Sequence, residues 1–402
     1  MKIKILVVAI LSLLVFSNSK AQKKAQKPYL IVLSMDGFRW DYIDSFPTPN
    51  LHKLVAKGVR AKSLEPSFPS VTFPNHYTMA TGLYPDHHGI VHNSFYDSTL
   101  NLTYRLGDRK TVEDGRFYGG EPIWITAEKQ NMRTASFYWV GSEAPIMGMH
   151  PTYWKPYDKK VTFEQRIDTV IYWLSLPEIQ RPHLVMFYYD QPDKISHETG
   201  PFSPETRAMV MRLDSLAGIF LDKIEKLPIY NKLNFIVTSD HGMGEISNSR
   251  KIVLGDHIKK EWCSRINGHN PIYMLDAKAG YIDSIMINLS NVPHLKIWRK
   301  QNVPMQLHFG NNARIGDLVV LADSAYALSW EGDKTDNGGA HGYDPANTDI
   351  HGIFYASGPA FKKGYVTPSF ANIHLYAMFA AILHLKAAPN DGNIRKVKRM
   401  LR

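Results

Sequence analysis

The chain has 402 residues, of which 44% are hydrophobic and 21% are charged, so it is long and apolar enough to bury a sizeable core in one large domain or in two or three smaller ones. Its single cysteine, Cys263, excludes an intramolecular disulfide framework. The net charge of +10 is spread along the chain apart from a cluster over residues 20–27, which we interpret as a flexible start of the mature chain rather than as a nucleic-acid-binding arm.

The first element in the chain is a predicted signal peptide. Lys2 and Lys4 precede an apolar run over residues 5–16, and Ser19-Lys20-Ala21 supplies a small-x-small cleavage site. The run is shorter than the roughly 20 residues of a membrane-spanning helix, and no later stretch of sequence resembles one. We therefore expect cleavage after Ala21 and a periplasmic or secreted chain over residues 22–402 without a membrane span. An uncleaved anchor is the alternative.

Five short runs rich in β-branched and aromatic residues predict strands that end in polar or glycine-bearing turns. They are Tyr29–Met35, Thr134–Val140, Leu184–Tyr189, Phe235–Thr238 and Gly352–Ala356. Stretches with helical spacing of apolar residues lie between them, for example Thr206–Lys226. This alternation indicates an α/β fold with a mostly parallel sheet flanked by helices. In such sheets, ligands bind beyond the carboxyl ends of the strands.

A segment over about residues 245–338 separates two of the motif-bearing regions. It contains three further candidate strands, Ile272–Asp276, Met286–Leu289 and Leu318–Ala322. We expect it to form a small subdomain inserted in a single catalytic domain over residues 22–402.

Six acidic or histidine residues stand at or near the ends of the predicted strands and are candidate metal ligands. They are Asp36, Asp193, His197, Asp240, His241 and His341. Each alone is also explained as a turn residue, a helix cap or a surface histidine. Asp193 and His197 are one helical turn apart and can face one ion, while Asp240 and His241 directly follow a strand. Carboxylate oxygens together with imidazole nitrogens favour zinc over magnesium or calcium, and six ligands suit two ions.

The candidate nucleophile is Thr72, within Pro69-Ser-Val-Thr-Phe-Pro-Asn-His-Tyr-Thr78. A hydroxyl group needs a base or a metal to become an effective nucleophile. The sequence has no Gly-x-Ser-x-Gly motif, and no feature of it indicates a serine triad. Activation of Thr72 by zinc is therefore our hypothesis, and an ordinary loop threonine is the alternative.

Five segments resemble motifs of the nucleotide pyrophosphatase/phosphodiesterase family, which belongs to the alkaline phosphatase superfamily. They are Ile31-Val-Leu-Ser-Met-Asp-Gly-Phe-Arg39, Thr72-Phe-Pro-Asn-His-Tyr-Thr-Met-Ala-Thr-Gly-Leu-Tyr-Pro-Asp-His-His-Gly89, Gln191-Pro-Asp-Lys-Ile-Ser-His-Glu-Thr-Gly-Pro201, Thr238-Ser-Asp-His-Gly-Met243 and Gly339-Ala-His-Gly-Tyr-Asp344. They occur in the order found in the family and spread over nearly all of the mature chain. The resemblance implies an alkaline phosphatase-like fold and hydrolysis of nucleotide phosphodiester or pyrophosphate bonds.

The resemblance also implies a role for each candidate residue. One zinc ion would be held by Asp36, Thr72, Asp240 and His241, and the other by Asp193, His197 and His341. Thr72 would attack phosphorus and form a threonyl-nucleotide intermediate, and Asn93 would bind a phosphate oxygen. The family's usual glutamate and glycine are replaced by Gln191 and Ser196, which are not ligand positions.

The resemblance places four aromatic residues, Phe73, Trp139, Tyr157 and Tyr188, around the base and nucleoside of a nucleotide substrate. Stacking of this kind accepts any base. The alternative for Trp139 and Tyr188 is that they are core strand residues. Gly119, directly before Gly120-Glu121-Pro-Ile-Trp124, stands where the family has a lysine, which weakens the expectation of a preference for triphosphates.

Two other functions remain open from the sequence. A choline-phosphodiester hydrolase of the same family would use an aromatic cage for the quaternary ammonium group. A catalytically inactive zinc- or nucleotide-binding protein is the alternative outside the enzymes, although Thr72 and the six ligand candidates are all present.

Overall fold

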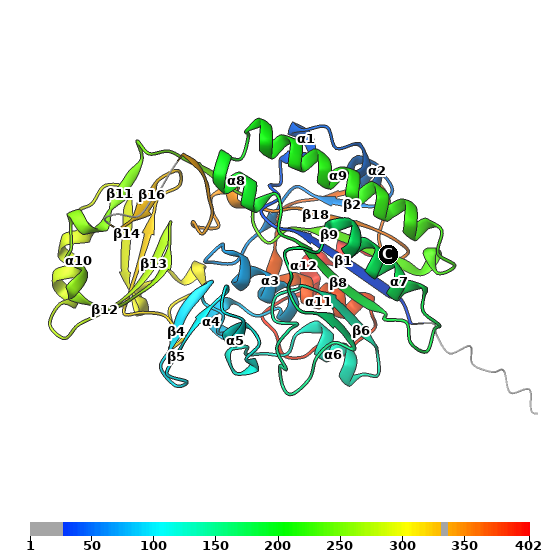
Figure 1. Ribbon diagram of the computed structural model, residues 1–402, viewed down its shortest axis with the longest axis horizontal. Helices are drawn as coiled ribbons and strands as arrows, with labels where there is room; N and C mark the ends of the chain where they lie inside the picture. Colours follow the sequence, from blue (N-terminus) through cyan, green and yellow to red (C-terminus); the bar gives the residue numbers. More distant parts are fainter. Residues whose placement is uncertain (1–26, 331–336) are drawn as a thin grey trace, which may run out of the picture.

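The structure is a computed structural model that describes residues 27–330 and 337–402, so the predicted signal peptide lies outside the described residues. Its centre is an eight-stranded sheet with the order β19-β2-β18-β9-β1-β8-β6-β7 (Figure 1). These strands are β1 (Tyr29–Met35), β2 (Val59–Ala61), β6 (Thr134–Phe137), β7 (Tyr153–Lys155), β8 (Leu184–Tyr189), β9 (Leu233–Thr238), β18 (Phe354–Ser357) and β19 (Tyr365–Thr367). Among the described helices, none has both the length and the apolar character needed to cross a membrane.

The sheet is mostly parallel, as the sequence predicted. β1 pairs in parallel with β8 and β9, and β6 pairs in parallel with β7 and β8. β18 is antiparallel to both of its neighbours, β9 and β2. β6 ends at Phe137, three residues earlier than expected, because Tyr138 turns the chain with a φ of 71°. The carboxyl ends of β1, β8 and β9 therefore lie together at one edge.

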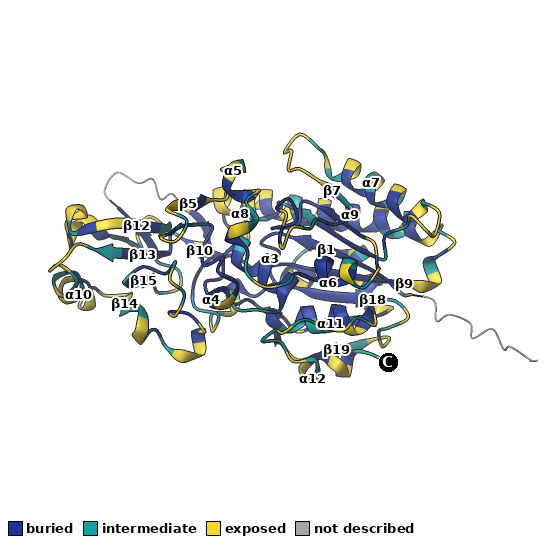
Figure 2. Cartoon of the chain, turned by 90° about the horizontal axis from the view of Figure 1, so that it is seen from below, coloured by how far each residue is buried: buried dark blue, intermediate teal, exposed yellow. Residues whose placement is uncertain are grey.

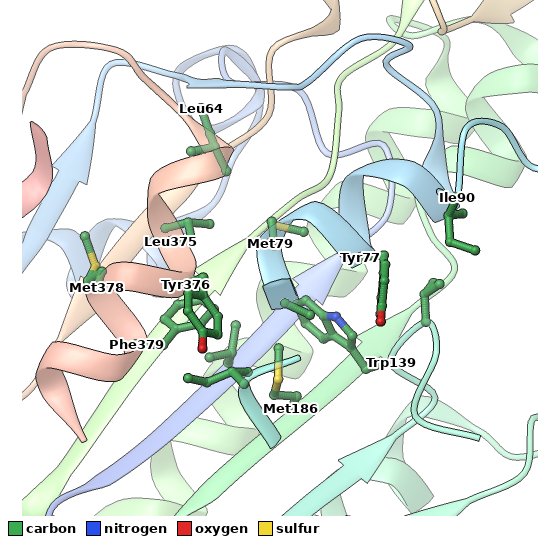
Figure 3. Close-up of a cluster of buried hydrophobic side chains, with 14 of the residues drawn as sticks. Leu64, Tyr77, Met79, Ile90, Trp139, Met186, Leu375, Tyr376, Met378 and Phe379 are labelled. Carbon is green, nitrogen blue, oxygen red and sulfur yellow. The ribbon is translucent and has the colours of Figure 1, made fainter. Parts of the chain in front are cut away.

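Helices cover both faces of the sheet because the side chains of β1 alternate between two hydrophobic clusters. Leu30 and Val32 face the cluster that includes α3 (Thr72–Thr81), α6 (Ile123–Lys129) and α11 (Leu375–Ile382). Ile31 and Leu33 face the cluster that includes α2 (Pro49–Ala56), α7 (Phe163–Ser175) and α9 (Pro204–Glu225). Figure 3 shows part of the hydrophobic cluster that includes α3 and α11. Figure 1 shows α9 and α2 on the opposite side of the sheet from α3 and α11.

The long helix α9 packs on the face of the main sheet that carries Ile31 and Leu33, and a substitution in it can test this packing. Phe220 is fully buried, and its ring lies 5.3 Å from that of Phe187 and 5.1 Å from that of Phe235. We expect Phe220→Ala to lower the free energy of unfolding by about 3–5 kcal/mol, because a cavity remains between helix and sheet. Urea denaturation measures this loss, with the neighbouring exposed residue as the control: Ile219→Ala should cost less than about 1 kcal/mol.

A second, antiparallel sheet lies at the other end of the molecule, with the strand order β12-β13-β15-β14 (Figure 2). Its strands are β12 (Cys263–His269), β13 (Ile272–Ala277), β14 (Leu295–Arg299) and β15 (Leu318–Ala322), and it packs with α10 (Ile282–Ser290) around its own hydrophobic cluster. The short strands β10 (Gly244–Ile246) and β17 (Gly338–Ala340) pair where this segment leaves and rejoins the main sheet. The boundary of about 245–338 for an inserted subdomain stays a prediction.

The expectation of a strand over Met286–Leu289 was wrong, because these residues belong to helix α10. Ile282, Ile285, Met286 and Leu289 recur at helical spacing, and all four pack in the cluster of the second sheet. The apolar run was too short to distinguish the two periods.

The remaining elements are short. They are α1 (Tyr42–Ser45), α4 (Pro85–His88), α5 (Arg109–Val112), α8 (Asp193–Thr199), α12 (Ile394–Val397), β3 (Leu64–Glu65), β4 (Ser94–Asp97), β5 (Leu102–Arg105), β11 (Lys251–Val253), β16 (Ala327–Ser329) and β20 (Phe370–Ala371).

Candidate active site

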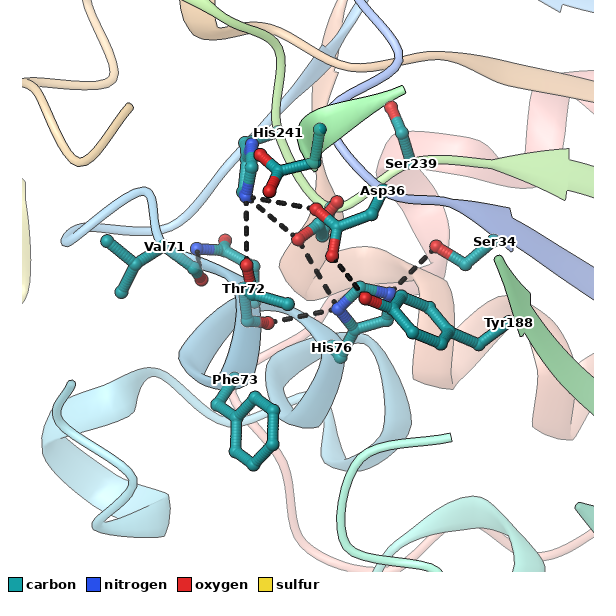
Figure 4. A network of polar contacts seen from close by, with 12 residues as sticks. Ser34, Asp36, Val71, Thr72, Phe73, His76, Tyr188, Ser239 and His241 are labelled. Carbon is teal, nitrogen blue, oxygen red and sulfur yellow. Dashed lines mark hydrogen bonds and ion pairs between the residues drawn. The ribbon is translucent and has the colours of Figure 1, made fainter. Parts of the chain in front are cut away.

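The six candidate ligands come together at the carboxyl edge of the main sheet. Asp36 follows β1, Asp240 and His241 follow β9, and His341 follows β17. Asp193 and His197 lie on α8, which follows β8. They form two adjoining groups, which we call the first cluster (Asp36, Asp240 and His241) and the second cluster (Asp193, His197 and His341). Figure 4 shows part of the first cluster with its neighbours.

The first cluster offers three ligand atoms within 4.8 Å of one another. The Nε2 atom of His241 lies 3.0 Å from Oδ2 of Asp240 and 3.4 Å from Oδ1 of Asp36. Both of these carboxylate oxygens are buried without a hydrogen-bond partner among the described residues. Buried polar atoms are almost always satisfied, so this arrangement indicates a bound cation.

The second cluster is arranged in the same way around Asp193. Its Oδ1 atom lies 3.3 Å from Nε2 of His197 and 3.4 Å from Nε2 of His341, and it too is buried without a hydrogen bond within the described chain. Ligand atoms of Asp193, His241 and His341 also lie within 4.8 Å of one another. Since the rings of His241 and His341 stack with centroids 3.6 Å apart, the two clusters share one wall.

The three histidines are all oriented for metal binding. Each donates its Nδ1–H to a backbone carbonyl: His197 to Gly339 at 2.8 Å, His241 to Gly242 at 2.8 Å, and His341 to Ser70 at 2.9 Å. The Nε2 lone pairs therefore face the carboxylates. In metal sites, a hydrogen bond from the other ring nitrogen orients a histidine ligand in the same way. The residues thus fit metal ions held by mixed oxygen and nitrogen ligands.

The charges of the three aspartates also indicate a bound cation. Burial and the neighbouring carboxylates of Asp240 and Asp193 raise the pKa of Asp36 well above its ordinary value. Three carboxylates held this close repel one another, and a divalent cation between them removes the repulsion.

Two glycines allow α8, which carries Asp193 and His197, to approach the loop after β1 and the strand β17. Gly37 has a φ of 68°, and a Cβ atom there would lie 2.8 Å from Cα of Asp193. A Cβ atom at Gly338 would lie 2.1 Å from the carbonyl oxygen of His197, so α8 packs directly on β17. Both positions bring a ligand of the second cluster into place.

Thr72 is the first residue of α3, and its Oγ1 atom lies 3.3 Å from Nε2 of His241 in the first cluster. Asn93 lies beside it, and its Oδ1 atom accepts the backbone N–H of Phe73 at 2.9 Å. This bond fixes the amide of Asn93 and leaves its NH₂ group as a donor.

His76, one helical turn after Thr72, is a site residue that was not expected from the sequence. It is fully buried, and its Nδ1 atom lies 3.0 Å from the carbonyl of Thr72 and 3.4 Å from Oδ2 of Asp240. Its Nε2 atom is 2.8 Å from the hydroxyl of Ser34 on β1 (Figure 4). His76 therefore ties Thr72 to the first cluster. The i, i+4 spacing from Thr72 was the available signal.

The four aromatic residues have different positions. Phe73 is partly buried and Tyr157 is 40% exposed, so both present surface to solvent. Tyr188 is half-buried, and its hydroxyl donates to Oδ2 of Asp36 at 2.5 Å, so it also orients a ligand of the first cluster.

The expected substrate contact of Trp139 is not supported. Its ring is fully buried and packs with Tyr77 and Met186 in the core (Figure 3), and its indole N–H donates to the carbonyl of His76 at 3.1 Å. The large apolar ring is more stable there than in a wet pocket. The alternative of a core residue is the correct one.

The chain is similar to several known proteins. The family described as type I phosphodiesterase/nucleotide pyrophosphatase matches residues 30–344. Human ectonucleotide pyrophosphatase/phosphodiesterase family member 5 is 33% identical, over 99% of this chain and 83% of its own. A venom phosphodiesterase from Macrovipera lebetinus is 35% identical over 96% of this chain, but the chain spans only 47% of that protein, about half its length.

Solved structures agree with this likeness. Murine ectonucleotide pyrophosphatase/phosphodiesterase 5 superimposes with a TM-score of 0.90 at 33% identity, covering 94% of this chain and all of that one. An inactive threonine-to-alanine variant of the murine protein, in complex with AMP, also superimposes with a TM-score of 0.90, at 32% identity over the same shares. The main sheet thus has the alkaline phosphatase-like architecture expected from the motifs. The chain belongs to the type I phosphodiesterase/nucleotide pyrophosphatase family of hydrolases.

Proposed function

We propose that the protein is a zinc-dependent hydrolase of nucleotide phosphodiester and pyrophosphate bonds, which releases nucleoside 5′-monophosphates through a threonyl-nucleotide intermediate. The observation that carries this proposal is the position of the Thr72 hydroxyl, 3.3 Å from Nε2 of His241, at the edge of three carboxylates and three histidines. The names of its relatives and the AMP complex of the murine protein support it.

Two zinc ions suit the donor set. The first cluster and Thr72 would hold one ion, and the second cluster would hold the other. When bound, the ions would supply positive charge that lowers the pKa of the Thr72 hydroxyl and of a water molecule, and that stabilises negative charge on the phosphate.

The residues of the chain carry out the remaining steps. The Thr72 hydroxyl gives up its proton and its oxygen forms a bond to phosphorus, while the bond from phosphorus to the leaving oxygen breaks. The leaving oxygen departs with a proton, and the covalent intermediate remains. The NH₂ group of Asn93 donates to a non-bridging oxygen, and the N-terminus of α3 adds a favourable dipole for the phosphate. Water then attacks the intermediate and releases the nucleotide and the free hydroxyl.

We also propose that Phe73 and Tyr157, with the half-buried ring of Tyr188, flank the nucleoside. The partly exposed rings of Phe73 and Tyr157 offer surface for a base, which stacks on aromatic side chains whatever its identity. The predicted signal peptide and the venom phosphodiesterases among the relatives support a role outside the cytoplasm.

Thymidine 5′-monophosphate p-nitrophenyl ester tests the substrate class. We expect the protein to hydrolyse this diester far faster than p-nitrophenyl phosphate, and Phe73→Ala to weaken nucleotide binding by roughly 1–3 kcal/mol. Phe73 is the residue to replace, because Tyr188→Ala would also remove a hydrogen bond to Asp36. If Phe73→Ala hydrolyses the diester normally and glycerophosphocholine is the better substrate, the choline-phosphodiester alternative is correct.

A further inference from the structure

The tip of the β12–β13 hairpin brings His269 from the second sheet to the second cluster. β12 ends at His269, and the next turn packs against the loop that follows β17: a Cβ atom at Gly342 would lie 2.9 Å from Cδ of Pro271. On the other side of the hairpin, the guanidinium of Arg265 lies 3.8 Å from the ring centroid of Tyr96 on β4. These two contacts hold the hairpin tip in place beside the site.

His269 has a free hydrogen-bond acceptor. Its Nδ1 atom donates to the carbonyl of Asn270 at 3.0 Å, so the Nε2 atom of the neutral ring carries a lone pair. Protein surrounds the ring on several sides and this burial lowers its pKa, yet part of the side chain is exposed to solvent. The turn that follows His269 reaches the second cluster, because Pro271 packs against Gly342, the residue after His341. An exposed, neutral acceptor thus stands beside the second cluster.

The ring of His92 packs against the ring of His269. His92 is fully buried directly before Asn93, and its Nδ1 atom accepts the backbone N–H of Ser94 at 3.3 Å. Its ring meets that of His269 edge to face, with centroids 4.7 Å apart at 68°. This contact fixes His269 relative to the residue that donates to the phosphate, so His92 is a positioning residue.

The direction of attack places His269 on the leaving-group side. The Thr72 hydroxyl contacts His241 of the first cluster. In an in-line displacement the leaving oxygen departs on the side of phosphorus opposite to the nucleophile. Because His269 lies two residues before Pro271, which packs against the residue after His341 of the second cluster, it is on the part of the site that the Thr72 hydroxyl does not contact.

We propose that Nε2 of His269 accepts a hydrogen bond from a hydroxyl group next to the leaving oxygen. The substrates preferred are then phosphodiesters whose leaving alcohol carries a free neighbouring hydroxyl, such as a ribonucleoside. This inference rests on the proposed function and specifies its substrate class. A fully ionised pyrophosphate leaving group has only acceptor oxygens, so it cannot donate a hydrogen bond to Nε2 of His269. The lone pairs of its oxygens and of Nε2 repel each other instead.

Two dinucleoside monophosphates test this inference, because they differ only in the 2′-hydroxyl of the nucleoside that leaves through its 3′-oxygen. For the unaltered protein we expect kcat/KM to be roughly 2- to 10-fold higher for the ribose form, the effect of one net hydrogen bond. In His269→Ala the ratio should fall to about 1. His257→Ala, which changes an exposed histidine of the same segment, should keep the full ratio.

The p-nitrophenyl diester provides the internal reference, since its leaving group has no hydroxyl. The rate of His269→Ala on this ester is the value to which its rates on the two dinucleoside monophosphates are referred, and an unchanged melting temperature shows that the variant is folded. His257→Ala should hydrolyse all three diesters at the unaltered rate. If the unaltered protein hydrolyses none of the three diesters, the proposed function itself is wrong. If it hydrolyses them but treats ribose and deoxyribose alike, or if His269→Ala keeps the ratio, the role of His269 is overturned.

Discussion

Thr72→Ala is expected to lower kcat/KM for nucleotide diesters by roughly a thousandfold to a millionfold, the range found when a covalent nucleophile is removed. Without the hydroxyl, water must attack phosphorus directly and lacks the positioning that α3 gives to Thr72. The six other ligands are unchanged, so the metal content should stay close to that of the unaltered protein. Diester hydrolysis and elemental analysis of the same preparation measure both effects.

Thr72→Ser is the matched control. It keeps the hydroxyl and loses only the methyl group that restricts its rotamer, so activity should remain within about tenfold of the unaltered protein. A chiral phosphorothioate diester adds an independent test, because two successive displacements give net retention at phosphorus. Net inversion would show that water attacks directly and that Thr72 is not the nucleophile.

Removal of the metal is the second large effect. A chelator should abolish diester hydrolysis, and added zinc should restore it. The melting temperature should fall as well, since the carboxylates of Asp36, Asp193 and Asp240 then lie together without a cation. An ion present at a thousandfold above its dissociation constant stabilises the folded state by about 4 kcal/mol. Activity and stability unchanged after complete removal of zinc would contradict the proposed cofactor.

The two clusters should respond separately to substitution. Elemental analysis should give about two zinc ions per chain, and His341→Ala should retain about one, because one of the three side-chain ligands in the second cluster is lost. His257→Ala should retain both ions. Magnesium in place of zinc would contradict the argument from the imidazole ligands.

Much of the main sheet was predictable from local pattern. The ranges of β1 and β8 match the predicted runs, because strands buried on both faces are nearly continuous in apolar residues and end at polar turns. The ligand candidates were predictable for the same reason, since Asp36 directly follows β1 and Asp240 comes two residues after the end of β9. Asp193 and His197 meet one turn apart, as their spacing indicated.

Other features depend on contacts between distant segments, which spacing does not encode. Trp139 follows β6 as a pocket residue would, but the helix that carries His76 covers it. Tyr188 alternates with core residues along β8, and only the fold shows that its hydroxyl reaches Asp36. His269 belongs to none of the motifs, and it reaches the site because the hairpin tip packs against Gly342.

The pairing of β10 with β17 has a consequence for how the protein acquires activity. Asp240 and His241 come before the second sheet in the chain, whereas His341 comes after it, directly behind β17. His341, the last candidate ligand in the chain, therefore reaches the others only when β10 and β17 have paired at the two ends of the intervening segment. Contacts of such high sequence separation form late and slowly in folding. A chain still being synthesised has the residues of the first cluster before it has His341. On the proposed function, which uses both clusters, hydrolysis therefore begins only once nearly the whole polypeptide has folded.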